Sequence, residues 1–333
     1  MPMTDHNNLL ENAAHDLAML EAQLNGVIVG QQQLIRELLI AVFAGGHVLL
    51  EGLPGLGKTH LAKALAASLD LQFGRVQCTP DLLPADITGS EILIGGGHAA
   101  GAFEFRPGPV FANLVLVDEI NRATPRTQAA LLEAMQERQV TYGGRSHALP
   151  DPFCVLATQN PIELEGTFPL PEAQLDRFLF KLFVPYPAAE SLQALLETSL
   201  DQEPADHLEP VCSLSRVREL LAAGRQVLSA EPVRSAAIKL VLATQPESEF
   251  ASPVARDHIR YGASPRALQS LIRAARIRAL FEGRVHIACE DLAALAHPAL
   301  RHRVLLHTTS ELDGHTANSI LDQIVAEWAE THL

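Results

Sequence analysis

A glycine-rich loop, GLPGLGKTH at residues 52–60, carries the clearest chemical signal in this sequence. Gly52, Gly57, Lys58 and Thr59 occupy the fixed positions of the phosphate-loop pattern G-x-x-x-x-G-K-[ST]. Glycines let the backbone approach phosphate oxygens without a clashing Cβ, Lys58 brings a positive charge to the outer phosphates, and the Thr59 hydroxyl can bind Mg²⁺. The spacing therefore predicts a site for a nucleoside triphosphate.

The residues around the loop favour this interpretation over a glycine-rich surface turn. Residues 47–51 form a short apolar run before the loop, and residues 59–69 after it place leucines at 61, 65 and 69 on one helical face. A strand, a loop and a helix in this order direct backbone N–H groups at a helix N-terminus towards an anion. The loop residues expected to contact the nucleotide are Gly52, Pro54, Gly55, Leu56, Gly57, Lys58, Thr59 and His60.

Two adjacent carboxylates end a second apolar run, Leu114-Val-Leu-Val-Asp-Glu119. An acid at the end of such a strand usually holds Mg²⁺ beside the phosphate loop, so we expect Asp118 and Thr59 to form the metal site. Glu119 would face the γ-phosphate and orient or deprotonate the attacking water. The alternative is an acidic turn after a buried strand.

A third apolar run, at residues 153–158, leads into the polar sequence Thr-Gln-Asn that ends at Asn160. Ligands collect at the carboxyl ends of parallel strands, so the Asn160 amide is placed to bond the water or the γ-phosphate. Considered alone, an asparagine before Pro161 would simply be a favourable turn residue.

Composition limits the class of protein. The chain has 333 residues, 47% hydrophobic and 19% charged, with a formal net charge of −14, which suits two globular domains and weighs against broad DNA binding. The four cysteines are far apart and match no C-x-x-C pair, so we expect reduced, mostly buried thiols in a cytoplasmic protein. We find no apolar run long enough to span a membrane and no export signal.

The order of apolar runs predicts an α/β fold with a five-stranded parallel sheet. The expected strands are residues 47–51, 73–78, 114–118, 153–158 and 179–184, and helical stretches separate them. Nearly continuous apolar strands are typical of parallel sheets covered by helices on both faces.

The chain changes character after Pro187. Residues 188–333 are rich in Ala, Leu and Arg and show helical periodicity, with no convincing strand, which predicts a small all-helical domain after a core of residues 1–187. Two glycine-containing segments interrupt the core, at about 85–107 and about 138–150, and each reads as a β-hairpin. Both hairpins would be ordinary surface features in the simplest interpretation.

With these motifs in place, the sequence closely resembles the MoxR family of AAA+ ATPases from about residue 28 to about residue 305. Such a protein has an AAA+ P-loop domain followed by a helical lid. The matching segments are Ile28-Val-Gly-Gln31, the loop at 52–59, Thr79-Pro-Asp-Leu-Leu-Pro84, Phe105-Arg-Pro-Gly-Pro109, Val117-Asp-Glu-Ile-Asn-Arg122, Leu131-Leu-Glu-Ala-Met-Gln136, Ala157-Thr-Gln-Asn-Pro161, Phe168-Pro-Leu-Pro-Glu-Ala-Gln-Leu-Asp-Arg-Phe178 and Gly262-Ala-Ser-Pro-Arg266.

The resemblance implies roles for particular residues. Asn160 corresponds to the sensor 1 residue, and Arg266 to the sensor 2 arginine that reaches the γ-phosphate from the lid. Arg177 stands where the family keeps an arginine finger for the neighbouring subunit's nucleotide, and Val29 and Gly30 would lie against the adenine. The alternative for Arg177 is an ion pair with Asp176 or Glu172, and Arg122 and Arg126 are further candidate interface arginines. The two hairpins correspond to the helix-2 insert and the pre-sensor-1 insert.

The same resemblance implies partners and leaves other functions open. It implies ATP and Mg²⁺ as ligands, a ring homo-oligomer expected to be a hexamer, a partner with a von Willebrand factor A domain, and remodelling or maturation of a client protein. A nucleic-acid motor is the first alternative, with Arg138, Arg145 and His147 as candidate phosphate contacts, although the acidic chain does not favour it. A small-molecule kinase or GTPase is the second, but the sequence has no N-K-x-D motif.

Overall fold

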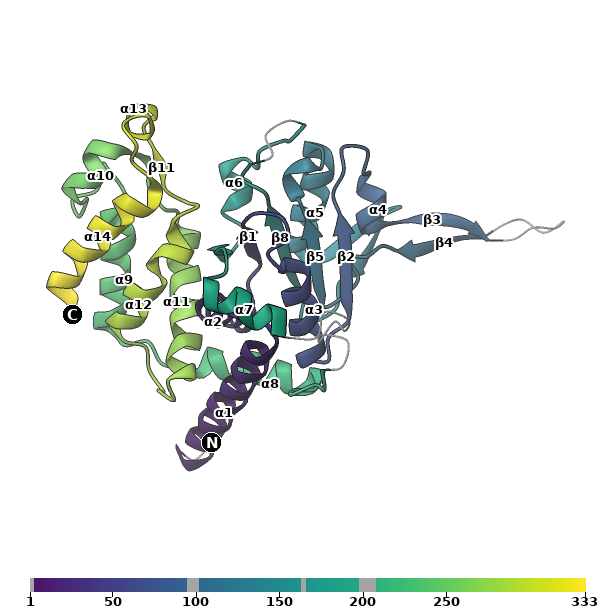
Figure 1. Ribbon diagram of the computed structural model, residues 1–333, viewed down its shortest axis with the longest axis horizontal. Coiled ribbons are helices and arrows are strands. Elements are labelled where there is room, and N and C mark those ends of the chain that lie inside the picture. The colour runs from purple at the N-terminus through teal and green to yellow at the C-terminus, as the bar shows by residue number, and fades with distance from the viewer. Residues whose placement is uncertain (1–2, 95–101, 163–165, 198–207) are drawn as a thin grey trace.

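A parallel sheet stands beside a helical half in the computed structural model, which describes residues 3–94, 102–162, 166–197 and 208–333 (Figure 1). The strands of the sheet are β1 (Val48–Glu51), β2 (Phe73–Gln77), β5 (Leu114–Asp118), β8 (Cys154–Gln159) and β9 (Phe180–Phe183). Their order is β2-β5-β8-β1-β9 with all neighbours parallel. The sequence prediction of five parallel strands is confirmed, and no strand end differs from it by more than one residue.

Helices cover both faces of this sheet. The helices before residue 198 are α1 (Met3–Val27), α2 (Gln32–Phe43), α3 (Lys58–Ser68), α4 (Pro84–Thr88), α5 (Pro125–Glu137), α6 (Glu172–Leu175) and α7 (Ala189–Glu197), with a 3₁₀ turn, η1, at Ile120–Arg122. In β5, Leu114 and Leu116 join the apolar cluster that contains α1, α2 and α3, whereas Val115 and Val117 join the cluster that contains α5. Side chains that alternate along the strand are therefore buried on both sides, which explains its uninterrupted apolar sequence.

Two antiparallel hairpins leave the sheet domain where the sequence predicts them. The first pairs β3 (Gly89–Ile94) with β4 (Ala102–Pro107) and projects as an arm, and the expected glycine-rich loop at 95–101 lies outside the described residues (Figure 1). The second pairs β6 (Gln139–Tyr142) with β7 (Arg145–Ala148). Its turn residues, Gly143 and Gly144, have positive φ angles of 56° and 75°, a conformation that glycine adopts without strain. Phe105 of β4 stacks on His147 of β7 with ring centroids 4.0 Å apart, so the second hairpin packs against the first near the base of the arm.

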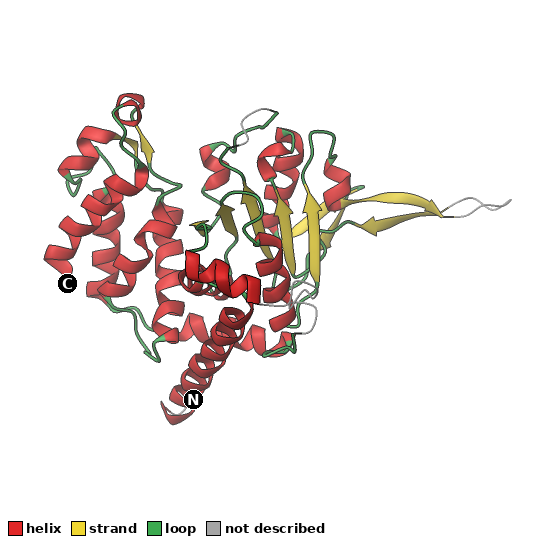
Figure 2. Cartoon of the chain, in the orientation of Figure 1, coloured by secondary structure: helices red, strands yellow, loops and turns green. Residues whose placement is uncertain are grey.

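The chain after residue 207 is almost entirely helical, as Figure 2 shows. Its helices are α8 (Leu214–Gln226), α9 (Glu231–Ala243), α10 (Pro253–His258), α11 (Pro265–Phe281), α12 (Cys289–Leu300), α13 (Thr308–Leu312) and α14 (Ala317–His332). The expectation of no strand here is wrong in one detail, because β10 (Ile259–Tyr261) and β11 (Leu305–Leu306) form a small antiparallel pair. Strands of three and two residues are too short to leave a periodic pattern in a sequence.

One apolar cluster joins the two halves. It runs from Val48 and Leu50 of the sheet through α1 and α2 to Leu271 and Ala274 of α11. Trp328 of α14 is buried against α9 and donates a hydrogen bond from Nε1 to the Ala236 carbonyl at 2.9 Å. The expected boundary after Pro187 remains a prediction, since this shared core crosses it.

The cysteines agree with a further expectation from composition. The four cysteines are free thiols, and all except the half-buried Cys289 are buried. Within the described ranges, no helix combines the length and the apolar character that crossing a membrane requires.

His47 ties the sheet to helix α5 and makes stability depend on pH. Its Nδ1 accepts a hydrogen bond from the Val155 N–H at 3.0 Å, and its Nε2 donates to the Met135 carbonyl at 3.2 Å. Burial lowers the pKa of His47 from 6.5 to about 4. Between these two pH values the unfolded chain therefore binds a proton at His47 that the folded chain does not. This group therefore contributes stability that is fully present above its unfolded pKa and is lost as the pH falls towards about 4.

We expect the wild-type free energy of unfolding to decrease as the pH is lowered from neutral to 5, with His47 contributing about 2 kcal/mol of that decrease. The variant His47→Gln should be less stable than the wild type at neutral pH but should lose less stability on acidification, because it has no proton to gain. Urea unfolding of both proteins across this range checks the difference. Parallel pH curves for the two proteins would contradict the role of His47.

Candidate functional site

A pocket of about 420 Å³ lies where the predicted chemical residues meet, at the carboxyl ends of β1, β5 and β8. Its walls come from the loop after β1, the start of α3, strand β2 and the ends of β5 and β8. The lining residues are Pro54, Gly55, Gly57, Lys58, Thr59, His60, Lys63, Arg75, Gln77, Asp118, Glu119, Thr158 and Asn160. The sheet thus brings together the three motifs that lie far apart in the sequence.

The loop conformation directs backbone donors into this pocket. Gly55 and Gly57 have φ angles of 79° and 78°, which a residue with a side chain would adopt only with strain. Helix α3 begins at Lys58, directly after Gly57, and the first N–H groups of a helix have no partner within it. Lys58 itself donates from Nζ to the Gly52 carbonyl at 2.6 Å. The loop therefore presents a ring of donors and a positive charge, which suits a polyphosphate.

Asp118 lies at the floor of the pocket, with a side chain that is only partly accessible. Arg75 Nε donates to its Oδ2 at 2.9 Å, and Thr158 Oγ1 donates to its Oδ1 at 3.3 Å. Thr59 lines the same pocket. A hydroxyl and a carboxylate are oxygen ligands of the kind that Mg²⁺ prefers, so the side chains present fit the predicted metal.

The backbone of Glu119 is held in the left-handed region, with φ 55° and ψ 51°. Such a conformation costs free energy for a residue with a side chain, and it changes the direction of the chain directly after β5. The Glu119 N–H donates to Thr158 Oγ1 at 2.8 Å, and its Oε2 accepts bonds from Arg122 Nη1 at 3.1 Å and Gln77 Nε2 at 3.3 Å. Three neighbouring side chains thus hold the proposed base at the pocket wall.

Asn160 supplies a buried donor to the same pocket. The residue is 4% exposed, and its Oδ1 accepts the Ile162 N–H at 3.3 Å. Its Nδ2 is buried and has no hydrogen-bond partner within the part of the chain that the structure describes. An unpaired buried amide is costly unless a ligand or water satisfies it, so this atom fits the expected contact with a water or a phosphate oxygen.

Four polar residues of this site, Lys63, Arg75, Gln77 and Thr158, were not singled out by the sequence analysis. Arg75 and Gln77 lie on β2, where Gln77 is the parallel partner of Asp118 in the register of β2 with β5. Thr158 lies on β8, and its single hydroxyl bonds both Asp118 and Glu119. Alternation along β2 could have suggested a polar face, but only the strand order places that face beside the acids.

The thiol closest to the acids is not reactive. Burial, together with the charges of Asp118 and Glu119, raises the pKa of Cys78 to about 12. The thiolate is the nucleophilic form of cysteine, so Cys78 stays protonated and unreactive near neutral pH. The chemistry of the pocket is therefore that of its carboxylates, amide and cations.

The residues predicted to contact the adenine lie beside the loop but do not line this pocket. Gln31 Nε2 donates to the Leu56 carbonyl at 3.3 Å, which brings the segment containing Val29 and Gly30 to the loop. A Cβ placed on Gly30 would lie 2.2 Å from Ser191 Oγ of α7, so α7 covers this side closely. Contact between this segment and a purine remains a prediction.

The two predicted arginines lie in a second pocket, of about 360 Å³, which we call the arginine pocket. Its lining residues are Gly45, Gly46, His47, Met135, Gln136, Arg138, Asp176, Arg177, Leu179, Arg266, Gln269, Ser270 and Arg273. Arg177 and Arg266 therefore share a pocket with each other and do not line the phosphate pocket of their own chain. This placement differs from a lid arginine that reaches the nucleotide of its own chain.

The ion-pair alternative for Arg177 does not match the described contacts, whereas Arg122 and Arg126 remain candidate interface arginines. Among the described residues, Arg177 forms no ion pair with Asp176 or Glu172; its Nη1 donates to the Leu132 carbonyl at 2.5 Å. Arg122 pairs with Glu119 in the phosphate pocket at 3.1 Å. Arg126 lines a separate pocket beside α4. Neither Arg122 nor Arg126 lines the arginine pocket.

The site combines a phosphate loop after one parallel strand with an acidic pair at the end of another, and a set of helices follows. These features define a P-loop ATPase with a lid. The chain matches the ATPase family associated with various cellular activities (AAA) over residues 47–180 and the AAA lid domain over residues 252–324.

Individual relatives extend this likeness along the whole chain. An uncharacterized protein of Bacillus subtilis, YeaC, is 41% identical over 91% of both chains. Chaperone MoxR1 of Mycobacterium tuberculosis is 39% identical over 93% of this chain and 81% of its own. A crystal structure of a presumed ATPase from Cytophaga hutchinsonii superposes with a TM-score of 0.89 at 38% identity, covering 97% of each chain. This chain belongs to the MoxR family of AAA+ ATPases.

Replacement of Glu119 and of Lys58 should separate hydrolysis from binding. Glu119→Gln should bind ATP normally but turn it over about 10²–10⁴-fold more slowly, because an amide cannot take a proton from water. Lys58→Ala should weaken binding as well, because it removes the charge at the outer phosphates. Equilibrium nucleotide binding and phosphate release measure the two effects, with Glu330→Gln, an exposed acid on α14, as a matched control. Turnover of Glu119→Gln within a few-fold of wild type would contradict its role.

Thr158→Val should remove the hydroxyl that holds both acids while keeping the shape of the side chain. We expect kcat to fall roughly tenfold or more with little change in ATP affinity, because the defect lies in the orientation of Glu119. Thr158→Ser, which keeps the hydroxyl, should stay close to wild type. Equal kcat values for the valine and serine variants would show that these hydrogen bonds do not matter for hydrolysis.

Proposed function

We propose that this chain hydrolyses ATP with Mg²⁺ at the interfaces between subunits of a cytoplasmic ring oligomer, expected to be a hexamer, and uses the energy to remodel or mature a protein partner. The observation that carries the proposal is the separation of the two pockets. The carboxylates and the phosphate loop line one pocket, whereas Arg177 and Arg266 line the other.

The arginine pocket has the charge expected of a surface that receives an anion. Arg138, Arg177, Arg266 and Arg273 line it, and Asp176 is the one carboxylate among its described lining residues. That carboxylate is already paired with Arg303 at 2.7 Å. In addition, Arg177 Nε is buried without a partner in the described part of the chain. A triphosphate presented by a neighbouring subunit would supply the missing acceptors and the missing negative charge.

Within the phosphate pocket, each side chain has a defined task. The N–H groups at the start of α3 and Lys58 bind the phosphates, Glu119 takes a proton from the attacking water, and Asn160 Nδ2 holds that water or a γ-phosphate oxygen. Thr59 and Asp118 would hold Mg²⁺, which neutralises charge on the phosphates when it is bound. The Thr158 hydroxyl bonds both Asp118 and the Glu119 backbone, so it fixes the positions of the two acids relative to each other.

We assign Arg177 and Arg266 together to the nucleotide of the adjacent subunit. A guanidinium facing the γ-phosphate offsets charge that grows in the transition state, an effect worth about 10³–10⁵ in rate for an arginine finger supplied in trans. Because both arginines line one pocket, a single approach of the neighbour can engage both. An isolated subunit would lack these charges and should hydrolyse ATP poorly.

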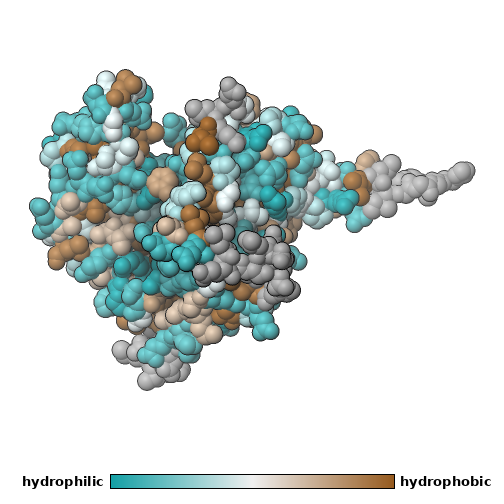
Figure 3. All heavy atoms as spheres, in the orientation of Figure 1, coloured by the Kyte–Doolittle hydropathy of each residue, from teal (hydrophilic) through white to brown (hydrophobic). Residues whose placement is uncertain are grey.

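A protein client is supported by one relative and by the shape of the chain. The Mycobacterium tuberculosis relative is named a chaperone. The β3–β4 arm stands clear of the body in the space-filling view (Figure 3), and its Ile92 and Phe103 are 40% and 70% exposed. Exposed apolar side chains on a projecting hairpin suit contact with a protein, such as the von Willebrand factor A domain partner expected for this family.

A nucleic-acid motor has less support from the same hairpins. His147 is stacked on Phe105, and Arg138 donates to the Gly45 carbonyl at 3.2 Å and lies 4.0 Å from Asp151. Two of the three candidate phosphate contacts are therefore already engaged within the chain. ATP hydrolysis that is stimulated by DNA and falls steeply with salt would reverse this preference.

Mixed rings test whether the site is shared between subunits. Arg177→Ala and Glu119→Gln should each be inactive alone, but an equal mixture should recover up to about a quarter of wild-type activity, since that share of interfaces joins an intact acid to an intact arginine. Steady-state hydrolysis after subunit exchange measures the recovery.

The matched control replaces Glu119→Gln in the mixture with the double variant Arg177→Ala/Glu119→Gln. That mixture contains no intact donor arginine and should remain inactive. Absence of recovery in the first mixture, with both proteins assembled, would contradict the assignment of Arg177 to the neighbour.

A further inference from the structure

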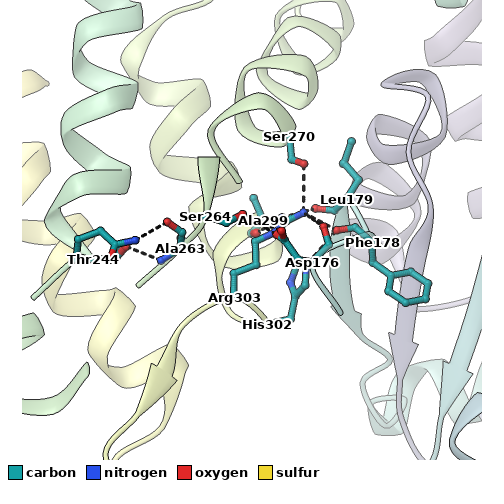
Figure 4. A network of polar contacts seen from close by, with 11 residues as sticks. Asp176, Phe178, Leu179, Thr244, Ala263, Ser264, Ser270, Ala299, His302 and Arg303 are labelled. Atoms are coloured by element: carbon teal, nitrogen blue, oxygen red, sulfur yellow. Dashed lines mark hydrogen bonds and ion pairs between the residues drawn. The ribbon is translucent and has the colours of Figure 1, made fainter. Parts of the chain in front are cut away.

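A deeply buried guanidinium joins the sheet domain to the helical half. The Arg303 side chain is 2% exposed and pairs with Asp176 through Nε at 2.7 Å (Figure 4). Its other nitrogens donate to carbonyl groups and to one hydroxyl. These acceptors are the carbonyls of Asp176 at 3.0 Å, Phe178 at 2.7 Å, Leu179 at 3.2 Å and Ala299 at 2.5 Å, and Ser270 Oγ at 3.3 Å.

Asp176 receives a second bond from the helical half. Ser264 Oγ lies 2.8 Å from Asp176 Oδ1 and 2.9 Å from Oδ2. Asp176 belongs to the segment between α6 and β9, Ser264 directly precedes α11, and Arg303 follows α12. We call these three residues the latch. The latch therefore connects one segment of the sheet domain to two separate segments of the helical half.

The latch lies beside both arginines of the arginine pocket. Arg177 directly follows Asp176, and Arg303 binds the carbonyls on both sides of it, at Asp176 and Phe178. Arg266 is the second residue after Ser264, in the first turn of α11. The latch thus holds the backbone beside Arg177 and the backbone beside Arg266.

The segment that carries Ser264 is also held from its other side. Thr244 Oγ1 accepts the Ala263 N–H at 2.9 Å (Figure 4). Gln245 Nε2 donates to the Ala263 carbonyl at 2.8 Å. Ser264 is therefore fixed to the lid through Ala263 and to the sheet domain through Asp176. A small change in the angle between the two halves would have to break these bonds.

We propose that Asp176 is a positioning residue, which through Ser264 and Arg303 holds Arg177 and Arg266 in one fixed arrangement for the neighbouring subunit's triphosphate. This inference rests on the proposed function. Stabilisation of charge in a transition state requires donors placed within fractions of an ångström, and a displacement of about 1 Å can cost about 10²-fold in rate. Arg177 belongs to the sheet domain and Arg266 to the helical half, so the two arginines meet that requirement only if the two halves are held in one arrangement.

The test uses the full chain with Asp176→Asn and Ser264→Ala. Asp176→Asn should lower kcat by roughly tenfold or more, and Ser264→Ala, which removes only one partner, by a few-fold. Equilibrium binding of ATP should stay within a factor of about two of wild type for both variants, because the phosphate pocket is untouched. Asp257→Asn, at an exposed position on α10, is the matched control and should have no effect.

Subunit mixing then shows which pocket the latch serves. Asp176→Asn should regain activity when mixed with Glu119→Gln, whose arginines are intact, but should gain none with Arg177→Ala, because both proteins then lack a competent donor. The opposite pattern, recovery with Arg177→Ala only, would place the defect in the variant's own phosphate pocket and would overturn the inference. Unchanged kcat in Asp176→Asn would also overturn it.

The outcomes separate this inference from the proposed function. If Arg177→Ala and Glu119→Gln fail to complement each other, the shared site itself is wrong. If that pair complements but the pair of Asp176→Asn with Glu119→Gln does not, only the latch is wrong. Should Asp176→Asn fail to assemble, Ser264→Ala decides by the same two mixtures, since it leaves the buried ion pair in place.

Discussion

The parallel pairing of β5 and β8 with their neighbours is the constraint on which the site depends. Because side chains at the carboxyl ends of parallel strands meet at one edge, Asp118, Glu119, Thr158 and Asn160 reach a single pocket beside the phosphate loop. The same register sets Gln77 of β2 opposite Asp118. Each of these four side chains thus lies at or just beyond the end of a strand in the buried sheet.

The second constraint is the distribution of charge between the two pockets. The phosphate pocket contains the carboxylates of Asp118 and Glu119 beside three cations, Lys58, Lys63 and Arg75, and Arg75 pairs with Asp118 at 2.9 Å. The arginine pocket contains four arginines, and its one described carboxylate, Asp176, is paired with Arg303. Under the proposed function, a chain that places the two acids in one pocket and Arg177 and Arg266 in the other gains a complete site only when a neighbour joins the two, which links hydrolysis to assembly.

Much of this arrangement could be predicted from the sequence, because the determining signals are local. The glycine spacing around Lys58 and the apolar run before Asp118 identify both motifs, and the five strands follow from runs of buried residues. Thr158 and the latch could not be predicted in this way. Their roles arise from contacts between segments such as Asp176 and Arg303, which are 127 residues apart, and only the packing of the lid on the sheet domain brings them together.

The central claim is that one molecule cannot complete its own site, and dilution tests it most directly. The measurement is the rate of ATP hydrolysis per subunit across a range of protein concentrations, with the assembly state followed in the same samples by sedimentation. The account predicts that the rate per subunit falls in step with the loss of the oligomer and returns on reconcentration. A rate per subunit that stays constant while the protein dissociates to monomers would contradict it.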